Sequence, residues 1–358
     1  MTNPNEIIPS EIFEVPQAII QTIKDTRLQA KKAAEQMIKR DPNRIFFIGN
    51  GTSYYSSLAA SYTARSLTSS PKSPYVIAIP SGDFQHYMPQ ITDRDIIVGM
   101  SASGEFRDVI TVFDQLKGKC LRIGITHVPN SKINQISDET LIAAGGASKV
   151  PVMTKTYAST LTAAHLLLLE FFEASESLYR NLEASASICE NSLKGVESRI
   201  EPIVATLKTY EHAFYFGAGI GYAASLEGAL KMKEMALLHA EGSEIWEYAS
   251  GPATIVDNRF FCTAFYTNNP SDRDTANSAR LSREWGARII EIGPVSYVHD
   301  YFLSVESNPF EAFNSLSLVP PAALLAYRMA RARGYNPDNP TWRERYYAQG
   351  MSHLIGPK

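Results

Sequence analysis

The sequence has few cysteines, little net charge and no metal-binding pattern. Its three cysteines lie far apart and form no Cys-x-x-Cys pair, so we expect neither a disulfide framework nor a thiolate zinc site. No cluster of His, Asp and Glu has metal-ligand spacing, and we expect no metal and no cofactor. Lysine and arginine number 34 against 37 acidic residues, a net charge of −3, which argues against nucleic acid or an anionic membrane as a partner.

Long hydrophobic runs are also missing. The longest, at residues 166–169, is flanked by His165 and Glu170, and it is too short to span a bilayer. Residues 1–16 are polar and acidic, so we expect no signal peptide or anchor, and a reducing cytoplasm suits the chain. What is present, 44% apolar and 20% charged residues over 358 positions, is typical of a globular protein with room for two domains.

Short apolar runs alternate with helical patterns in both halves, which predicts parallel sheets with helices on both faces. The expected strands are residues 44–48, 75–79, 95–100, 121–126 and 140–144, then 212–216, 253–256, 260–266, 288–292 and 301–305. The expected helices are a leader at 17–40, one ending near 67, two or three over 155–209, and a last one near 321–333.

The two halves share a cluster of residues after their first strands. Gly49, Gly51, Tyr54, Ser57 and Leu58 recur 168 positions later as Gly217, Gly219, Tyr222, Ser225 and Leu226. Clustered identities at one offset favour duplication of one α/β unit over chance similarity of two turns.

Two turns in the first half are rich in hydroxyl groups. Thr52 and Ser53 follow Gly51 after the first strand, and Ser101 and Ser103 follow the third. Hydroxyls and helix N-termini at the carboxyl ends of neighbouring strands suit the oxygens of a phosphate, although each turn would also serve as a helix cap. The missing third glycine disfavours a dinucleotide site.

Three charged residues follow the second glycine turn. Glu227, Lys231 and Glu234 are spaced to share one helix face. On a buried face they would mark a site, but the spacing alone favours a solvated surface pair. We take His239 as a structural helix residue, and Trp246 and Tyr248 as aromatic core rather than substrate lining.

Three motifs together resemble the double-SIS (sugar isomerase) phosphosugar proteins. They are GTS at residues 51–53, SxSGE at 101–105, and LEGALKxKE…HAE…E…GP at 226–252. The sequence is similar to the isomerase domain of glucosamine-6-phosphate synthase, to fructosamine-6-phosphate deglycases and to glucosamine-6-phosphate deaminases, over about residues 40–345. The resemblance implies an α/β fold of two flavodoxin-like SIS domains, each a parallel sheet in three αβα layers. The bounds we predict are a leader helix at 1–40, domains at 41–172 and 210–333, connector helices at 173–209, and a tail over the active site at 334–358.

The same resemblance implies roles for individual residues. Glu234 would move a proton between C1 and C2 of the sugar, and Lys231 would support the enediol charge. The residues expected to bind phosphate or sugar are Gly51, Thr52, Ser53, Ser101, Ser103, Glu105, Thr154, Ser250 and Arg345. A homodimer with shared sites is also implied.

Some positions depart from the family pattern. Ser250 stands where the family has a ring-opening histidine, Phe106 replaces a threonine of the phosphate loop, and Arg345 falls where the synthase has an imine-forming lysine. No glutaminase half is present, so we expect no glutamine-dependent synthesis from this chain alone. We therefore expect a deglycase, deaminase or isomerase of a sugar 6-phosphate. A non-catalytic sugar-phosphate regulator and an isomerase for another anion, such as a sulfonate, remain the alternatives.

Overall fold

The computed structural model describes residues 6–339 except 69 and 147. The chain divides into two compact units. The N-terminal unit holds residues 17–148 and 155–183, and the C-terminal unit holds the residues before 17, residues 149–154 and residues 184–339. Among the described residues, no helix combines the length and the apolar character needed to cross a membrane.

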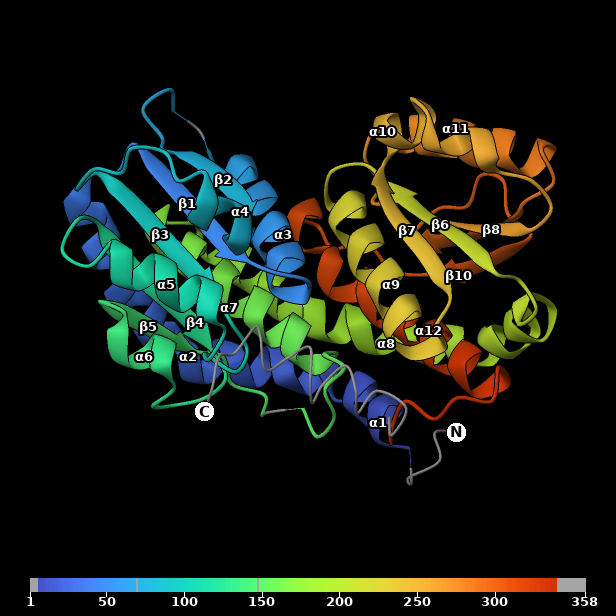
Figure 1. The fold of residues 1–358 in the computed structure, drawn as a ribbon, viewed down its shortest axis with the longest axis horizontal. Coiled ribbons are helices and arrows are strands. Elements are labelled where there is room, and N and C mark those ends of the chain that lie inside the picture. Colours follow the sequence, from blue (N-terminus) through green and yellow to red (C-terminus); the bar gives the residue numbers. More distant parts are fainter. Residues whose placement is uncertain (1–5, 69, 147, 340–358) are drawn as a thin grey trace. The chain divides into compact units, whose positions relative to one another are not determined.

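The N-terminal unit contains a sheet of five parallel strands in the order β2-β1-β3-β4-β5 (Figure 1). The strands are β1 Arg44–Gly49, β2 Tyr75–Pro80, β3 Asp95–Met100, β4 Leu121–Thr126 and β5 Glu139–Ile142. The helices are α2 Val15–Arg40, α3 Thr52–Leu67, α4 Ser81–His86, α5 Arg107–Gln115, α6 Lys132–Ile136 and α7 Lys155–Phe171. The edge strand β5 is covered by α2, where Gln29 accepts the Ile142 N–H at 2.7 Å and Thr26 donates to the Ile142 carbonyl at 2.7 Å.

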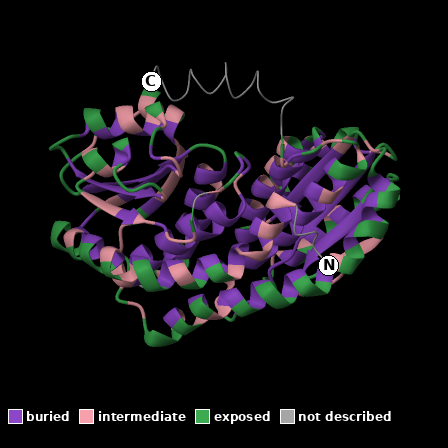
Figure 2. Ribbon diagram, turned by 90° about the horizontal axis from the view of Figure 1, so that it is seen from below, coloured by how far each residue is buried: buried purple, intermediate pink, exposed green. Residues whose placement is uncertain are grey.

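The C-terminal unit contains a second parallel sheet, in the order β10-β9-β8-β6-β7. Its strands are β6 His212–Gly217, β7 His239–Glu244, β8 Phe260–Phe265, β9 Arg288–Gly293 and β10 Tyr301–Ser304. Its helices are α1 Ile7–Phe13, most of α8 Glu176–Leu207, α9 Ile220–Ala236, α10 Ile245–Ala249, α11 Asp272–Glu284 and α12 Ser315–Ala332, with short 3₁₀ turns η1 Pro252–Ile255 and η2 Glu311–Phe313. Figure 2 shows that the strands of both sheets are mostly buried, as expected for parallel strands covered by helices on both faces.

Both sheets have the flavodoxin-like order. Numbered within each unit, the strands run 2-1-3-4-5 in both, which confirms the predicted fold class. The first turn is also the same: Gly51 has φ 52° and Gly219 has φ 53°, and each precedes a helix. A Cβ on Gly49 would lie 2.8 Å from the Ser53 backbone, and one on Gly217 would lie 2.7 Å from the Gly221 backbone. The repeated geometry supports duplication over chance similarity.

The second strand of the C-terminal unit was predicted at the wrong place. Residues 253–256 were expected to form a strand, but the structure has the 3₁₀ turn η1 there, because Pro252 lacks the N–H that a strand ladder needs and favours a helical first turn. The strand is β7, in a segment taken as helical. Helix α9 ends at Ala236, and Leu237 adopts a left-handed conformation with φ 52°. His239 is therefore an exposed strand residue, and its helical assignment is wrong.

The last helix begins earlier than predicted. Helix α12 starts at Ser315 and contains both Pro320 and Pro321, whereas the expected helix starts near residue 321. All its residues from Ser315 to Tyr327 are buried, and the helix packs along α9. We attribute the tolerance of the prolines to this packing, which offsets their lost backbone hydrogen bonds.

Candidate functional site

The two hydroxyl-rich turns lie beside each other in the N-terminal unit. Strands β1 and β3 are neighbours, with Ile48 opposite Gly99, so their carboxyl ends are level. The strand order reverses here, since the chain leaves β1 towards β2 on one side and returns to β3 on the other. Such switch points are where open α/β sheets bind ligands. The structure therefore brings Gly51, Thr52 and Ser53 to the same edge as Ser101 and Ser103.

Each turn is held in shape by its own hydrogen bonds. Thr52 and Ser53 are buried at the start of α3, and the Ser53 N–H donates to the Asn50 carbonyl at 3.1 Å. The Ser101 hydroxyl accepts the Gly104 N–H at 3.1 Å, and Ser103 accepts the Glu105 N–H at 3.3 Å. The Ser101 and Ser103 hydroxyls act only as acceptors in these two bonds, so each can still donate its own proton to an oxygen ligand.

Glu105 already has a structural partner. Its Oε1 accepts the Lys132 N–H at 2.8 Å, at the first residue of α6. The carboxylate thus satisfies a free donor of that helix end. This contact places Glu105 at the edge of the turn, where its negative charge would oppose an anion rather than hold it.

The sequence interpretation missed Asp108 at this edge. Asp108 lies in the first turn of α5, and its Oδ2 accepts hydrogen bonds from the Asn50 side-chain amide and from the Ser81 hydroxyl. One carboxylate therefore links the segments that follow β1, β2 and β3. An acidic residue in the first turn after SxSGE was the available signal, but its partners are distant in sequence.

His127 was also missed. It directly follows β4. Its backbone N–H donates at 3.0 Å to the carbonyl of Ala102, the residue between the two serines of the SxS turn. Its Nε2 lies 2.9 Å from the Thr160 hydroxyl and 3.2 Å from the Thr156 carbonyl. Burial lowers the pKa of His127 to about 4, with nearby Lys155 acting in the same direction, so the imidazole is neutral at pH 7.

The charged face of α9 is buried, and the prediction of a solvated surface pair is wrong. Lys231 Nζ lies 3.1 Å from Glu227 Oε1 and 2.6 Å from Glu234 Oε2. The side chains of Glu227 and Lys231 are 0% and 1% exposed, and that of Glu234 is 29% exposed. Burial alone would lower the pKa of Lys231, but the two carboxylates outweigh it and raise that pKa above its ordinary value. Lys231 is therefore an ammonium at neutral pH, and Glu234 is the member of the triad that reaches solvent.

Glycines hold α9 against its sheet. A Cβ on Gly242 of β7 would lie 2.7 Å from the Leu226 Cα, and one on Gly228 would lie 3.1 Å from the Tyr215 ring. Neither position accepts a larger side chain without movement. Glu234 comes 14 residues after Ile220, where α9 begins, which is about 21 Å along a helix. Glu234 is thus remote from the glycine turn of its own unit.

The remaining predicted residues have diverse surroundings. Thr154 is buried, and its hydroxyl has no hydrogen-bond partner among the residues described. Ser250 is exposed at the end of α10 and donates to the Trp246 carbonyl at 2.6 Å. Trp246 is 64% exposed, so its assignment to the core is wrong, whereas Tyr248 is buried as expected. Arg345 lies outside the described residues. The hydroxyl turns belong to the N-terminal unit and the triad to the C-terminal unit.

Comparison with known proteins assigns a family model to most of the N-terminal unit. Residues 38–170 match the family model of the SIS domain. The chain is 30% identical over 338 residues to a glutamine–fructose-6-phosphate aminotransferase (isomerizing) of Pyrococcus horikoshii, covering 92% of this chain and 55% of that protein. The chain thus spans about half the length of the curated relatives it matches.

Solved structures share the fold. The C-terminal domain of the glucosamine-fructose-6-phosphate aminotransferase of Francisella tularensis superposes with a TM-score of 0.85 at 22% identity, over 94% of this chain and 98% of that one. A glucosamine-6-phosphate deaminase of Thermotoga maritima gives 0.72 at 25% identity, over 90% and 97%. These matches confirm the resemblance to SIS phosphosugar proteins that the three sequence motifs indicated.

Proposed function

We propose that this chain, which carries a SIS domain over residues 38–170, binds a phosphorylated sugar or amino sugar and moves a proton between its first two carbons. The observation that carries the proposal is the pair of hydroxyl-rich turns at the switch point between β1 and β3. The named activities of the relatives, an isomerizing aminotransferase and a deaminase of glucosamine 6-phosphate, support the same substrate class.

The turns offer what a phosphate needs. The hydroxyls of Ser53, Ser101 and Ser103 would donate at one edge of the sheet, with Thr52 beside them, and the N-terminus of α3 adds backbone N–H groups. Hydrogen bonds to a charged acceptor are stronger than neutral ones. In this proposal the phosphate binds at these turns.

The triad on α9 supplies acid–base chemistry. Glu234 is partly exposed, so a substrate carbon can approach its carboxylate, while Lys231 holds one oxygen at 2.6 Å. Glu234 would take a proton from the carbon next to the carbonyl, giving an enediol, and return it to the neighbouring carbon. Lys231 remains cationic between two carboxylates, so it would stabilise negative charge that develops on the substrate oxygen.

A deglycase or deaminase activity on a 6-phosphate is favoured within this class. Arginine at position 345 cannot act as an amine nucleophile, whereas a glycated substrate carries its own amine. For a 1-amino-ketose, transfer of a proton from C1 to C2 and of the amine N–H proton to the C2 oxygen gives an imine at C1, which water hydrolyses to the sugar phosphate and the free amine. Ser250 in place of a ring-opening group favours substrates that are already open-chain.

A thermal-shift screen of sugar phosphates and glycated amino-acid phosphates, followed by product analysis in D₂O, tests the proposal. We expect stabilisation by a 6-phosphate and deuterium at C1 or C2 of the product. Binding without turnover would favour the non-catalytic regulator, and stabilisation by sulfonates alone would favour another anion. No stabilisation by any sugar phosphate would overturn the proposal.

We also propose a homodimer, which rests on the family resemblance alone. Light scattering at the assay concentration measures it, and a fully active monomer would contradict it.

A further inference from the structure

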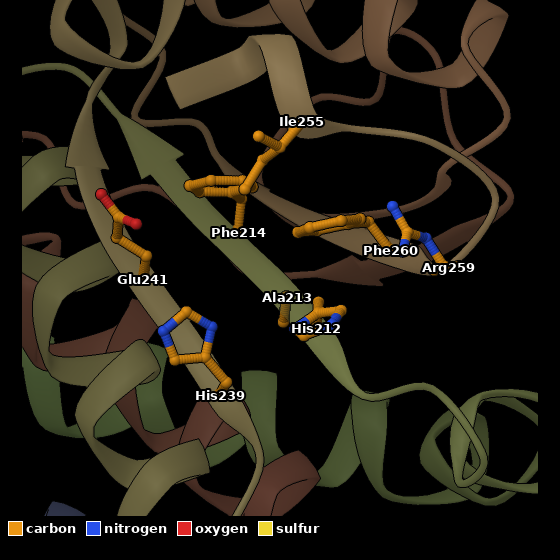
Figure 3. Close-up of a pocket in the computed structure, with 8 residues that line it drawn as sticks. All are labelled: His212, Ala213, Phe214, His239, Glu241, Ile255, Arg259 and Phe260. Carbon is orange, nitrogen blue, oxygen red and sulfur yellow. The ribbon is translucent and has the colours of Figure 1, made fainter. Parts of the chain in front are cut away.

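The C-terminal unit has a pocket of about 190 Å³ at the amino ends of β6, β7 and β8 (Figure 3). Its main lining residues are His212, Phe214, His239, Glu241, Ile255 and Phe260. None of the residues proposed to bind the sugar phosphate lines it. The pocket also lies at the opposite end of the strands from the glycine turn after β6, so it is separate from the carboxyl edge of its own sheet.

Strand register places the lining side chains on one face of the sheet. His212 of β6 is opposite both His239 of β7 and Phe260 of β8, and Phe214 is opposite Glu241. The His212 ring stacks on Phe260 with centroids 5.0 Å apart, and Phe260 stacks on Phe214 at 5.6 Å. Figure 3 shows Ile255 above the Phe214 ring and Glu241 on the other side of that ring from Phe260. The pocket therefore presents aromatic surfaces beside one carboxylate.

The polar groups around this aromatic surface lack partners. Over the part of the chain that the structure describes, the Glu241 carboxylate has no hydrogen bond or ion pair, and the ring nitrogens of His212 and His239 accept or donate none. Arg259, at the rim, is already held by Asp257, with its Nε 2.9 Å from Oδ2. The uncompensated charge at the pocket is therefore the negative charge of Glu241.

A metal ion does not fit these groups. Within the described residues, no three His, Cys, Asp or Glu side chains are arranged to hold a metal, and this includes the two histidines and Glu241. The ligand must instead satisfy a carboxylate and contact aromatic rings. A cation near an aromatic face is attracted to it, and an ammonium group also donates hydrogen bonds to carboxylate and imidazole acceptors.

We propose that this pocket binds a small primary ammonium ion on a short apolar body. The ammonium group pairs with Glu241 beside Phe214, and the alkyl part packs on Ile255 and Phe260. The volume corresponds to roughly six water molecules, which limits the ligand to a short chain. The proposal concerns the C-terminal unit alone and stands independently of the sugar-phosphate chemistry.

Ligand-observed NMR with n-butylammonium chloride and its neutral isostere n-butanol, at constant ionic strength and pH 7.5, tests this site. A ligand of this size binds on the order of millimolar, which the method detects. We expect the ammonium to bind at least fivefold more tightly than the alcohol, and Glu241→Gln to abolish that preference. Glu247→Gln, which removes another exposed carboxylate, from α10, is the control and should leave the preference unchanged.

A second variant separates the aromatic contribution from the charge. Phe260→Leu keeps an apolar side chain but removes a ring face, so ammonium binding should weaken about two- to fivefold while butanol binding changes less. Equal binding of the two ligands to the native protein, or an unchanged preference in Glu241→Gln, would overturn the proposal. The comparison in the native protein decides it even if a variant fails to fold.

Discussion

The two units share a sheet topology and a first turn, yet their switch points differ in chemistry. The N-terminal turn carries Thr52 and Ser53 after Gly51, whereas the C-terminal turn carries Ile220 and Gly221 after Gly219. The backbone conformation is the same, since both glycines have φ near 52°. The two turns thus share a backbone but differ in their side chains, and the anion site that we propose depends on the hydroxyls of the N-terminal turn.

The turns after the third strands differ in a second way. After β3, the serine hydroxyls accept backbone N–H groups. After β8, the buried carboxylate of Asp272 accepts the N–H groups of Thr267, Asn268 and Asn269 at 2.8 to 3.3 Å. The C-terminal unit thus satisfies these three donors with a carboxylate of its own chain.

The helices that follow the first turns also differ, and here the C-terminal unit has the charged residues. At the 168-residue offset, Glu227, Lys231 and Glu234 of α9 correspond to Ala59, Thr63 and Ser66 of α3. The charged triad therefore occurs on one copy, and the hydroxyl turns on the other. In the proposed function, one copy would bind the anion and the other would supply the acid–base chemistry, and the following substitutions test this division.

The largest effect is expected at Glu234. Glu234→Gln keeps the size of the side chain but removes its basicity, so turnover of any substrate found in the screen should fall roughly 10²–10⁴-fold, with binding within a few-fold of native. Steady-state kinetics and calorimetry measure the two effects, with Glu247→Gln as control. Unchanged turnover would mean that the base lies elsewhere.

Removing the cation of the triad should destabilise the C-terminal unit. Lys231→Met leaves two carboxylates at a buried site without their ammonium, which costs about 3–5 kcal/mol, whereas Thr63→Val at the equivalent position of α3 should cost far less. Urea denaturation measures both. The pKa of Lys231 is raised on folding, so its stabilising contribution is present below the ordinary lysine pKa and is lost as the pH rises through its folded-state value. A native-like stability of Lys231→Met would contradict the buried triad.

The anion site should lose affinity when one hydroxyl is removed. Ser101→Ala removes a donor to the phosphate, which should cost about 1.5–3 kcal/mol of binding free energy. Ser271→Ala, in the equivalent loop of the C-terminal unit, should leave the affinity unchanged. Calorimetry with the best sugar phosphate measures both, and equal affinities would reject the assignment of the turn.

Much of the fold follows from sequence because most strands are apolar runs bounded by turn residues. The missed strand, β7, shows the limit. On the face towards α9, Ala240 is small and Gly242 has no side chain, and a Cβ on Gly242 would lie 2.7 Å from the Leu226 Cα. Such residues have low strand propensity, so the strand is specified by the close approach of α9 and not by its own pattern.

The site shows a related limit. The spacing of Glu227, Lys231 and Glu234 would be the same on an exposed helix face and on a buried one. In the structure this triad is buried, and α12 packs along α9. That packing brings together residues about 90 positions apart in the chain. Likewise, the bonds from Asn50 and Ser81 to Asp108 depend on the strand order, which no single motif contains.

Acid sensitivity should distinguish the N-terminal unit. Because burial lowers the pKa of His127 to about 4, the unfolded chain takes up a proton near pH 6.5 that the folded unit does not. Stability should therefore fall as the pH drops from about 6.5 towards 4, and His127→Asn should flatten this part of the profile. His86→Asn, at an exposed position of the same unit, is the control. Thermal melts between pH 4 and 8 measure the effect, and identical slopes for the two variants would exclude His127 as its source.

The smallest effect is expected at Asp272, where two substitutions sharpen the comparison of the switch points. Asp272→Asn keeps a carbonyl oxygen that accepts the N–H groups of residues 267–269 and loses only the charge. Burial raises the pKa of Asp272, so the charged form is already disfavoured by desolvation, and the cost should be about 1 kcal/mol. Asp272→Ala leaves the same donors without an acceptor and should cost more, about 1–3 kcal/mol. Urea denaturation of the two variants measures the difference. If alanine were tolerated as well as asparagine, the Asp272 side chain would not be needed to accept the N–H groups of residues 267–269. The difference between the two switch points would then rest only on the turns after β1 and β6, and no longer on Asp272 against Ser101 and Ser103.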